Sequence, residues 1–212
     1  MPHIAVVDLG TGNLHSVAKA IEKLASPGQV RITSEAAVIR SADRVVLPGQ
    51  GAIASWFDAL IGRGLADAVQ NALGTKPVLG ICVGMQALFD HSDEDGGIDA
   101  LGLIAGSVRR FDHQCMTELG LKVPHMGWNR VTQSANHPLW EKIADGTRFY
   151  FVHSFYASAL KKEHIVGMTE YGAEFVSAVA RENVCAVQFH PEKSHRQGLQ
   201  LLENFLVWDP DS

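Results

Sequence analysis

Short apolar runs alternate with segments of helical periodicity along the N-terminal half of the chain, and this alternation constrains the fold most. The runs are Ile4–Asp8, Val30–Thr33, Arg44–Leu47 and Val78–Ile81. Continuous apolar runs are typical of strands that are buried on both faces. Helices are expected from Leu14, where apolar residues recur at helical spacing, and at 56–60 and 65–73. Alternating strands and helices predict a mostly parallel sheet covered by helices on both faces.

The pattern changes after about residue 95, where predicted strands follow one another with little helix between them. These strands are expected at 103–111, 149–153, 164–169, 176–180 and 184–189. Arg181-Glu182-Asn183 is predicted to form a hairpin turn between the last two. A helix from about Ser194 to Val207 ends the chain, and Ser194 with Gln197 has the spacing of a capping box. The prediction is one α/β domain over 1–212 with a mixed, mostly parallel sheet.

Composition narrows the possible environments and partners. The chain has 212 residues, a formal net charge of −5 and no basic run, so neither nucleic acid nor an anionic membrane is expected as a partner. No apolar stretch approaches the ~20 residues that cross a bilayer, and no signal peptide is apparent. Three cysteines are too few for a disulfide framework and favour a reducing compartment. A cytoplasmic protein is the resulting expectation.

The segment Gly80-x-Cys82-x-Gly84 follows a predicted buried strand and matches the thiol form of a nucleophile elbow. A sharp strand-to-helix turn holds the central residue in a strained conformation, and flanking glycines relieve the steric collision. The turn would aim the sulfur at a helix N-terminus, where the dipole favours a thiolate, and the Val83 N–H could donate to an oxyanion. Taken alone, the elbow leaves open a buried cysteine that packs as a small apolar residue.

The tripeptide His190-Pro191-Glu192 supplies a candidate base and its orienting group. In an extended chain residues i and i+2 lie on the same side, so Glu192 can bond one imidazole nitrogen and leave the other free for a thiol. Pro191 is incompatible with a helical metal-binding motif, and no cysteine or histidine spacing indicates a metal or cofactor site. A strand-end histidine paired with a carboxylate for stability is the alternative.

Six segments together resemble the class I, triad-type glutamine amidotransferases over nearly the whole chain. They are Asp8-Leu-Gly-Thr-Gly-Asn13-Leu, Leu47-Pro-Gly-Gln-Gly51-Ala, Gly80-Ile-Cys-Val-Gly-Met-Gln86, Val123-Pro-His-Met-Gly-Trp-Asn129, Tyr150-Phe-Val-His-Ser-Phe-Tyr156 and Gln188-Phe-His-Pro-Glu-Lys-Ser194. The resemblance implies a flavodoxin-like fold and a glutaminase in which Cys82, His190 and Glu192 form the catalytic triad. The segment around Trp128 indicates the branch of the family that serves histidine biosynthesis.

The resemblance also implies how glutamine and the oxyanion are held. The second oxyanion donor would come from the Gly49-Gln50-Gly51 turn. The family usually has an aliphatic residue where this chain has Gln50, a change that a backbone donor tolerates. Glutamine itself would be bound by Gly51 and Gln86 and by the backbone of Ser154 and Phe155.

Ammonia must remain unprotonated to act as a nucleophile, so a glutaminase without an acceptor site needs a dry route to a synthase. By resemblance that partner is a (β/α)8-barrel cyclase. A large aromatic residue beside Met and Asn is typical of an interface anchor. The predicted docking face consists of Asn13, His125, Met126, Trp128 and Asn129. The alternative is that Trp128 belongs to the core.

Three other functions compete with a glutaminase subunit. Gly10-Thr-Gly12 with Glu35 partly matches a dinucleotide-binding motif, although His15 stands where its third glycine belongs. A stand-alone thiol hydrolase of γ-glutamyl compounds would share the elbow and triad. A catalytically idle binding protein would not need the intact triad that the sequence contains.

Overall fold

The computed structural model describes residues 3–10 and 14–210, and its N-terminal half alternates strands and helices as expected. The strands are β1 (Ile4–Val7), β2 (Val30–Thr33), β3 (Arg44–Gly49) and β4 (Val78–Cys82). The helices are α1 (Leu14–Glu22), α2 (Ala36–Ser41), α3 (Ile53–Gly62), α4 (Ala66–Leu73) and α5 (Val83–Gln86). The four strands predicted here are confirmed, whereas α2 was not predicted.

The second half is built mainly of strands. They are β5 (Phe89–Ser92), β6 (Ile98–Asp99), β7 (Ile104–Arg110), β8 (His125–Arg130), β9 (Thr132–Gln133), β10 (Arg148–His153), β11 (Phe155–Ala159), β12 (Ile165–Tyr171), β13 (Ala173–Arg181) and β14 (Val184–Val187). Two helices accompany them, α6 (His113–Glu118) and α7 (His195–Val207). The predicted hairpin is confirmed, because β13 and β14 pair antiparallel across the turn.

Twelve strands of the described residues form one mixed sheet, whose main path is β2-β1-β3-β4-β14-β13-β11-β7-β5-β6, with β12 pairing with β13 and β9. The adjacent strands β2, β1, β3, β4 and β14 are parallel. From β14 to β7 the neighbouring strands pair antiparallel, β7 and β5 pair in parallel, and β5 and β6 pair antiparallel. Strands β8 and β10 form a separate antiparallel ribbon. The predicted α/β class with a mixed sheet is therefore confirmed.

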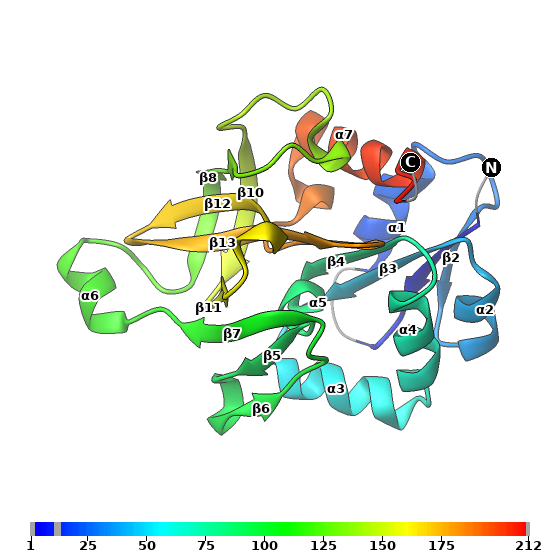
Figure 1. The fold of residues 1–212 in the computed structure, drawn as a ribbon, viewed down its shortest axis with the longest axis horizontal. Coiled ribbons are helices and arrows are strands. Elements are labelled where there is room, and N and C mark those ends of the chain that lie inside the picture. Colours follow the sequence, from blue (N-terminus) through cyan, green and yellow to red (C-terminus); the bar gives the residue numbers. More distant parts are fainter. Residues whose placement is uncertain (1–2, 11–13, 211–212) are drawn as a thin grey trace.

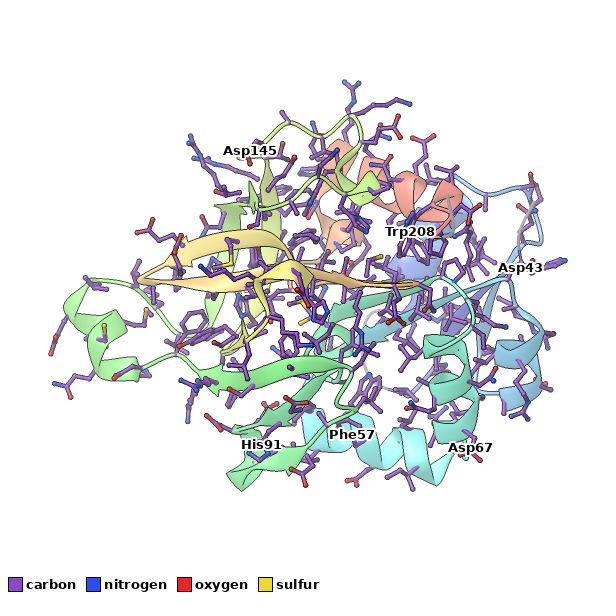
Figure 2. All side chains as sticks on the ribbon, viewed as in Figure 1. Asp43, Phe57, Asp67, His91, Asp145 and Trp208 are labelled. Carbon is purple, nitrogen blue, oxygen red and sulfur yellow. The ribbon has the colours of Figure 1, made fainter. Side chains whose placement is uncertain are left out.

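Helices cover both faces of the parallel strands (Figure 1). Helices α1 and α7 contact each other on one face, and α2 and α4 contact each other on the other. Side chains fill the space between the sheet and these helices (Figure 2). The strand residues Val6, Val46 and Leu79 are fully buried. No helix of the described residues is long and apolar enough to span a membrane.

Strand β8 was not predicted because its hydrophobic pattern is inverted. Its buried position carries His125, whereas the exposed positions carry Met126 and Trp128. A period-2 pattern identifies a strand only when its apolar side faces the core. The inversion therefore both hides the strand from sequence analysis and marks an unusual apolar surface.

The capping box at the start of α7 was predicted wrongly. The Ser194 side chain makes no capping hydrogen bond. Its hydroxyl instead donates to the His190 carbonyl at 2.7 Å and accepts from the Tyr150 N–H at 3.0 Å. The hydroxyl is therefore engaged in tertiary contacts with β10, and it does not cap the helix as the local spacing predicts.

Candidate active site

Cys82 lies at the carboxyl end of β4, in the strained turn that an elbow requires. Its φ is 56° and its ψ is −110°, a conformation that non-glycine residues rarely adopt. The residue is 4% exposed, and its side chain reaches a cavity beyond the carboxyl ends of the parallel strands. Ligands of open α/β sheets bind at this edge.

The glycines on either side of Cys82 are required by close packing. A Cβ at position 80 would lie 2.7 Å from the Gly84 carbonyl oxygen. A Cβ at position 84 would overlap the carbonyl oxygen of Leu47 on β3. The turn can therefore approach its neighbours this closely only without side chains at these two positions.

Helix α5, which follows the elbow, has only four residues, Val83–Gln86. A macrodipole is the sum of aligned peptide dipoles, so one turn of helix stabilises an anion less than a longer helix would. The Val83 N–H opens this turn and has no intrahelical acceptor, and Val83 lines the cavity. Most stabilisation of a thiolate must come from other groups.

His190 and Glu192 meet as predicted, although through a different local structure. His190 Nδ1 donates to Glu192 Oε1 at 2.8 Å, and both side chains are almost completely buried. The chain from Pro191 to Lys193 is a turn of 3-10 helix rather than extended. The His190 N–H also donates to the Tyr150 carbonyl at 2.9 Å, which anchors the histidine to β10.

The pKa of His190 depends on its neighbours Cys82 and Glu192. Burial alone would lower its pKa, but the charge and hydrogen bonding of Cys82 and of Glu192 outweigh burial and raise the pKa to about 9. Among the described residues Nε2 has no hydrogen bond of ordinary geometry and is buried. At neutral pH His190 is therefore an imidazolium, whose Nε2–H is available for transfer.

A cavity of about 390 Å³ contains Cys82 and His190 together with most predicted substrate-binding groups. Val83, Gln50, Gly51, Gln86, Ser154 and Phe155 all line it. Glu192 lies behind His190 and does not line it. The structure thus brings the predicted triad, oxyanion and substrate-binding residues to one place, and their individual roles remain predictions.

Two backbone carbonyls beside this cavity are already engaged by the protein. The Ser154 carbonyl accepts from the Phe111 N–H at 3.1 Å. The Phe155 carbonyl accepts from Gln86 Nε2 at 3.0 Å and from His153 Nδ1 at 2.7 Å. These bonds hold the connection between β10 and β11 at a fixed position along the cavity wall.

Sequence reasoning assigned no role to several side chains at this site. Gln188 contacts the Cys82 sulfur, its Nε2 lying 3.6 Å from Sγ. His153, Glu94 and Lys193 line the cavity, and Lys193 Nζ lies 5.9 Å from the centre of the Tyr150 ring. Gln188, His153 and Lys193 all fall within the six segments that carry the family resemblance, which was the available signal.

His153 belongs to a directed chain of neutral hydrogen bonds. Because the Phe155 carbonyl only accepts, His153 Nδ1 must carry the proton and its Nε2 must accept. His125 Nδ1 therefore donates to His153 Nε2 at 2.9 Å, and Asn129 Nδ2 donates to His125 Nε2 at 3.3 Å. Burial lowers the pKa of His125 to about 4 and that of His153 to about 3, so both rings are neutral at pH 7.

The predicted docking residues separate into an exposed and a buried set. Met126 is 62% exposed and Trp128 is 42% exposed, so Trp128 is not a core residue. Its indole stacks on His195 with ring centres 5.0 Å apart. His125 is only 3% exposed, so its side chain offers little surface for docking, and Asn129 is half-buried. Asn13 lies outside the described residues.

Arg63 lies beside Gly10 of the partial dinucleotide-binding motif. A Cβ on Gly10 would meet the Arg63 guanidinium, and Arg63 Nη1 donates to the Asp8 carbonyl. Gly12 lies outside the described part of the chain. Within that part no cluster of three or more metal-binding side chains occurs.

The family model for class-I glutamine amidotransferases matches residues 5–208 of the chain. The chain therefore belongs to the class-I glutamine amidotransferase family. It is 53% identical over 210 residues to the imidazole glycerol phosphate synthase subunit HisH of Pseudomonas putida, with 99% of both chains covered. It is 54% identical to the subunit of the same name from Dechloromonas aromatica, covering 98% of this chain and 97% of that one.

Solved structures share the fold at lower sequence identity. A putative GMP synthase subunit from Thermoplasma acidophilum superimposes with a TM-score of 0.72 at 22% identity, covering 97% of this chain and 92% of that one. The glutaminase domain of a Trypanosoma brucei CTPS gives a TM-score of 0.64 at 18% identity and covers 99% and 95%. These likenesses support the fold.

Proposed function

We propose that this protein is a glutaminase that hydrolyses glutamine to glutamate and ammonia. The observation that carries the proposal is the shared cavity of Cys82 and His190, with Glu192 bonded to the far nitrogen of the imidazole at 2.8 Å. This arrangement provides a thiolate nucleophile, a proton donor aimed at the same space and a carboxylate that fixes the tautomer.

The groups support a two-step reaction. The Cys82 thiolate attacks the side-chain carboxamide carbon of glutamine, and His190 Nε2–H protonates the departing nitrogen, which leaves as ammonia. The product is a γ-glutamyl thioester and a neutral imidazole. His190 then takes a proton from water, whose oxygen attacks the thioester carbon, and the C–S bond breaks to release glutamate and restore the thiolate–imidazolium pair.

Backbone and amide groups around the cavity would bind the substrate and its transition state. The Val83 N–H and a backbone donor of the Gln50 turn stabilise the oxyanion of both tetrahedral intermediates. Gly51, Gln86 and the backbone of Ser154 and Phe155 hold the glutamine. Gln86 Nε2 is already engaged, so its Oε1 is the atom free to accept from the substrate ammonium group.

The ammonia is used by a second subunit. The relatives are named as subunits of imidazole glycerol phosphate synthase, so this chain would pair with the cyclase subunit of that enzyme in histidine biosynthesis. The proposed partner is a (β/α)8-barrel that converts ammonia and a phosphoribulosyl substrate into imidazole glycerol phosphate. Met126 and Trp128 provide exposed apolar area for docking, Asn129 lies beside them, and Asn13 remains a candidate. The expected location is the cytoplasm.

Glutamate production tests this proposal. The isolated chain is expected to hydrolyse glutamine slowly, and addition of the cyclase subunit with its nucleotide substrate should accelerate hydrolysis strongly. Full activity of the isolated chain would instead indicate a stand-alone hydrolase. Absence of hydrolysis in the complex, or unchanged activity in Cys82→Ala, would contradict the triad.

A further inference from the structure

We propose that Gln188 is a fourth catalytic residue, whose side-chain N–H bonds to the Cys82 sulfur and stabilises the thiolate. The proposal deepens the proposed glutaminase function and rests on Cys82 being the nucleophile. It starts from a buried row of three side chains. Gln188 is fully buried, Gln86 is 3% exposed, and Gln188 Nε2 lies 3.6 Å from Cys82 Sγ.

The orientation of both amides follows from one backbone carbonyl. The Phe155 carbonyl oxygen can only accept, so the Gln86 atom 3.0 Å from it must be the NH₂ group. The second N–H of that group lies 3.0 Å from the Gln188 amide, where it needs an acceptor, so Gln188 presents Oε1 to Gln86. Gln188 Nε2 is then the end that faces the sulfur. The opposite orientation would bring two NH₂ groups together and direct an oxygen at the thiolate.

The backbone holds Gln188 in place for this contact. The residue follows β14, and its N–H donates to the Ser177 carbonyl on β13 at 2.9 Å. Because β14 pairs in parallel with β4, the segment that follows it emerges beside the elbow that follows β4. One short segment therefore delivers both the N–H of Gln188 and the imidazole of His190 to the same sulfur.

A buried N–H matters here because other stabilising groups are few. Helix α5 is a single turn and provides only a small dipole. A hydrogen bond to an ionised acceptor is about twice as strong as a neutral one, and a low local dielectric strengthens it further. When the sulfur becomes acylated its charge disappears, so this bond favours the thiolate over both the thiol and the thioester. Gln188 thereby favours the return of the leaving sulfur in the second step.

The test measures the thiolate directly in the full-length chain. The rate of Cys82 alkylation by iodoacetamide is followed against pH by peptide mass spectrometry, with the exposed Cys115 as internal reference. Gln188→Met keeps the length of the side chain without a donor. Gln188→Glu is isosteric, still accepts from Gln86 and places an oxygen at the sulfur. Gln133→Met is the matched control, because it removes an amide that donates at 2.8 Å to the Ile143 carbonyl away from the cavity.

In Gln188→Met the alkylation midpoint should rise by about one pH unit, which is a tenfold loss of thiolate or about 1.4 kcal/mol. Gln188→Glu should raise the alkylation midpoint at least as far. If the methionine variant does not fold, the result for Gln188→Glu decides the test. Cys115 and the Gln133→Met chain should keep their wild-type profiles. An unchanged Cys82 midpoint in a folded Gln188 variant would overturn the proposal. Because alkylation needs no glutamine, a shift of the midpoint in a chain that hydrolyses no glutamine would refute only the glutaminase function.

Discussion

Two buried histidines that line the same cavity are held in opposite protonation states. His190 and His153 both line the cavity, and both are at most 6% exposed. The pKa of His190 is raised to about 9, whereas that of His153 is lowered to about 3. Burial acts in the same direction on both rings, so it cannot explain the difference.

The difference comes from the partners of each ring. His190 lies between Cys82 and Glu192, whose charge and hydrogen bonding favour an imidazolium. His153 faces a carbonyl oxygen and a second neutral imidazole, which leave desolvation as the dominant effect. The same cavity thus has one histidine with a transferable proton and a second whose hydrogen bonds stay fixed because its ring is neutral near pH 7.

The strongest test of this comparison is removal of the thiolate. Cys82→Ala should lower glutamine hydrolysis in the complex more than about 10⁴-fold, because the nucleophile is lost. It should also lower the pKa of His190, since the largest effect that raises it disappears. Histidine NMR titration would show both rings, and the pKa of His153 should change little. A His190 pKa that stays near 9 would mean that Glu192 alone holds its proton.

Removal of the carboxylate is expected to have the next largest effect. Glu192→Gln should reduce the rate of glutamine hydrolysis by about 10³- to 10⁴-fold, because the imidazole loses its fixed tautomer and an anion that stabilises its charged form. The measurement is kcat in the complex at saturating glutamine. Glu141→Gln, at an exposed carboxylate outside the cavity, is the control and should leave kcat unchanged.

A smaller effect is expected from removal of the neutral His153 ring. His153→Leu removes one of the two donors to the Phe155 carbonyl and leaves His125 Nδ1 without its acceptor. The KM for glutamine should rise about fivefold to tenfold, the value of one neutral hydrogen bond, with little change in kcat. His137→Leu is a suitable control, because burial also lowers the pKa of His137 but the ring lies outside this cavity. If kcat fell and KM stayed constant, the hydrogen-bonded chain of neutral histidines would take part in proton transfer.

His190, on the one hand, and His153 with His125, on the other, should affect the stability of the protein at opposite ends of the pH range. His153 and His125 have folded pKa values below the ordinary 6.5, so their contribution is present above pH 6.5 and is lost as pH falls toward 4 and 3. His190 has a raised folded pKa, so its contribution is present below pH 6.5 and is lost as pH rises through about 9.

Chemical denaturation at several pH values would measure both limbs. Acidification from pH 7 to 5.5 should lower the free energy of unfolding by about 1 kcal/mol through His153 alone. This contribution of His153 to the loss should be absent in the His153→Leu variant. On the alkaline side, the decrease should move to lower pH in Cys82→Ala, where His190 has lost the thiolate. Identical acid limbs in wild type and His153→Leu would contradict the neutral state of this ring.

Local sequence was sufficient for the elbow, the acid–base pair and the alternating N-terminal half. Glycines at 80 and 84 are needed wherever a strand turns this sharply, and His190 and Glu192 are only two residues apart. The bond between them could therefore be predicted without knowing which distant segments of the chain pack nearby. The same closeness explains why the prediction succeeded although the local structure is a 3-10 turn and not an extended strand.

The contacts between distant segments were decided by the tertiary structure. Gln188 and Cys82 are 106 residues apart, and His125 and His153 are 28 apart. No local pattern specifies the pairing of β14 with β4 or of β8 with β10, and β8 even shows its apolar side to solvent. Sequence alone thus identified the residues of the predicted triad. Only the assembled sheet decided which buried groups face each side chain, and those neighbours leave His190 charged and His153 neutral at pH 7.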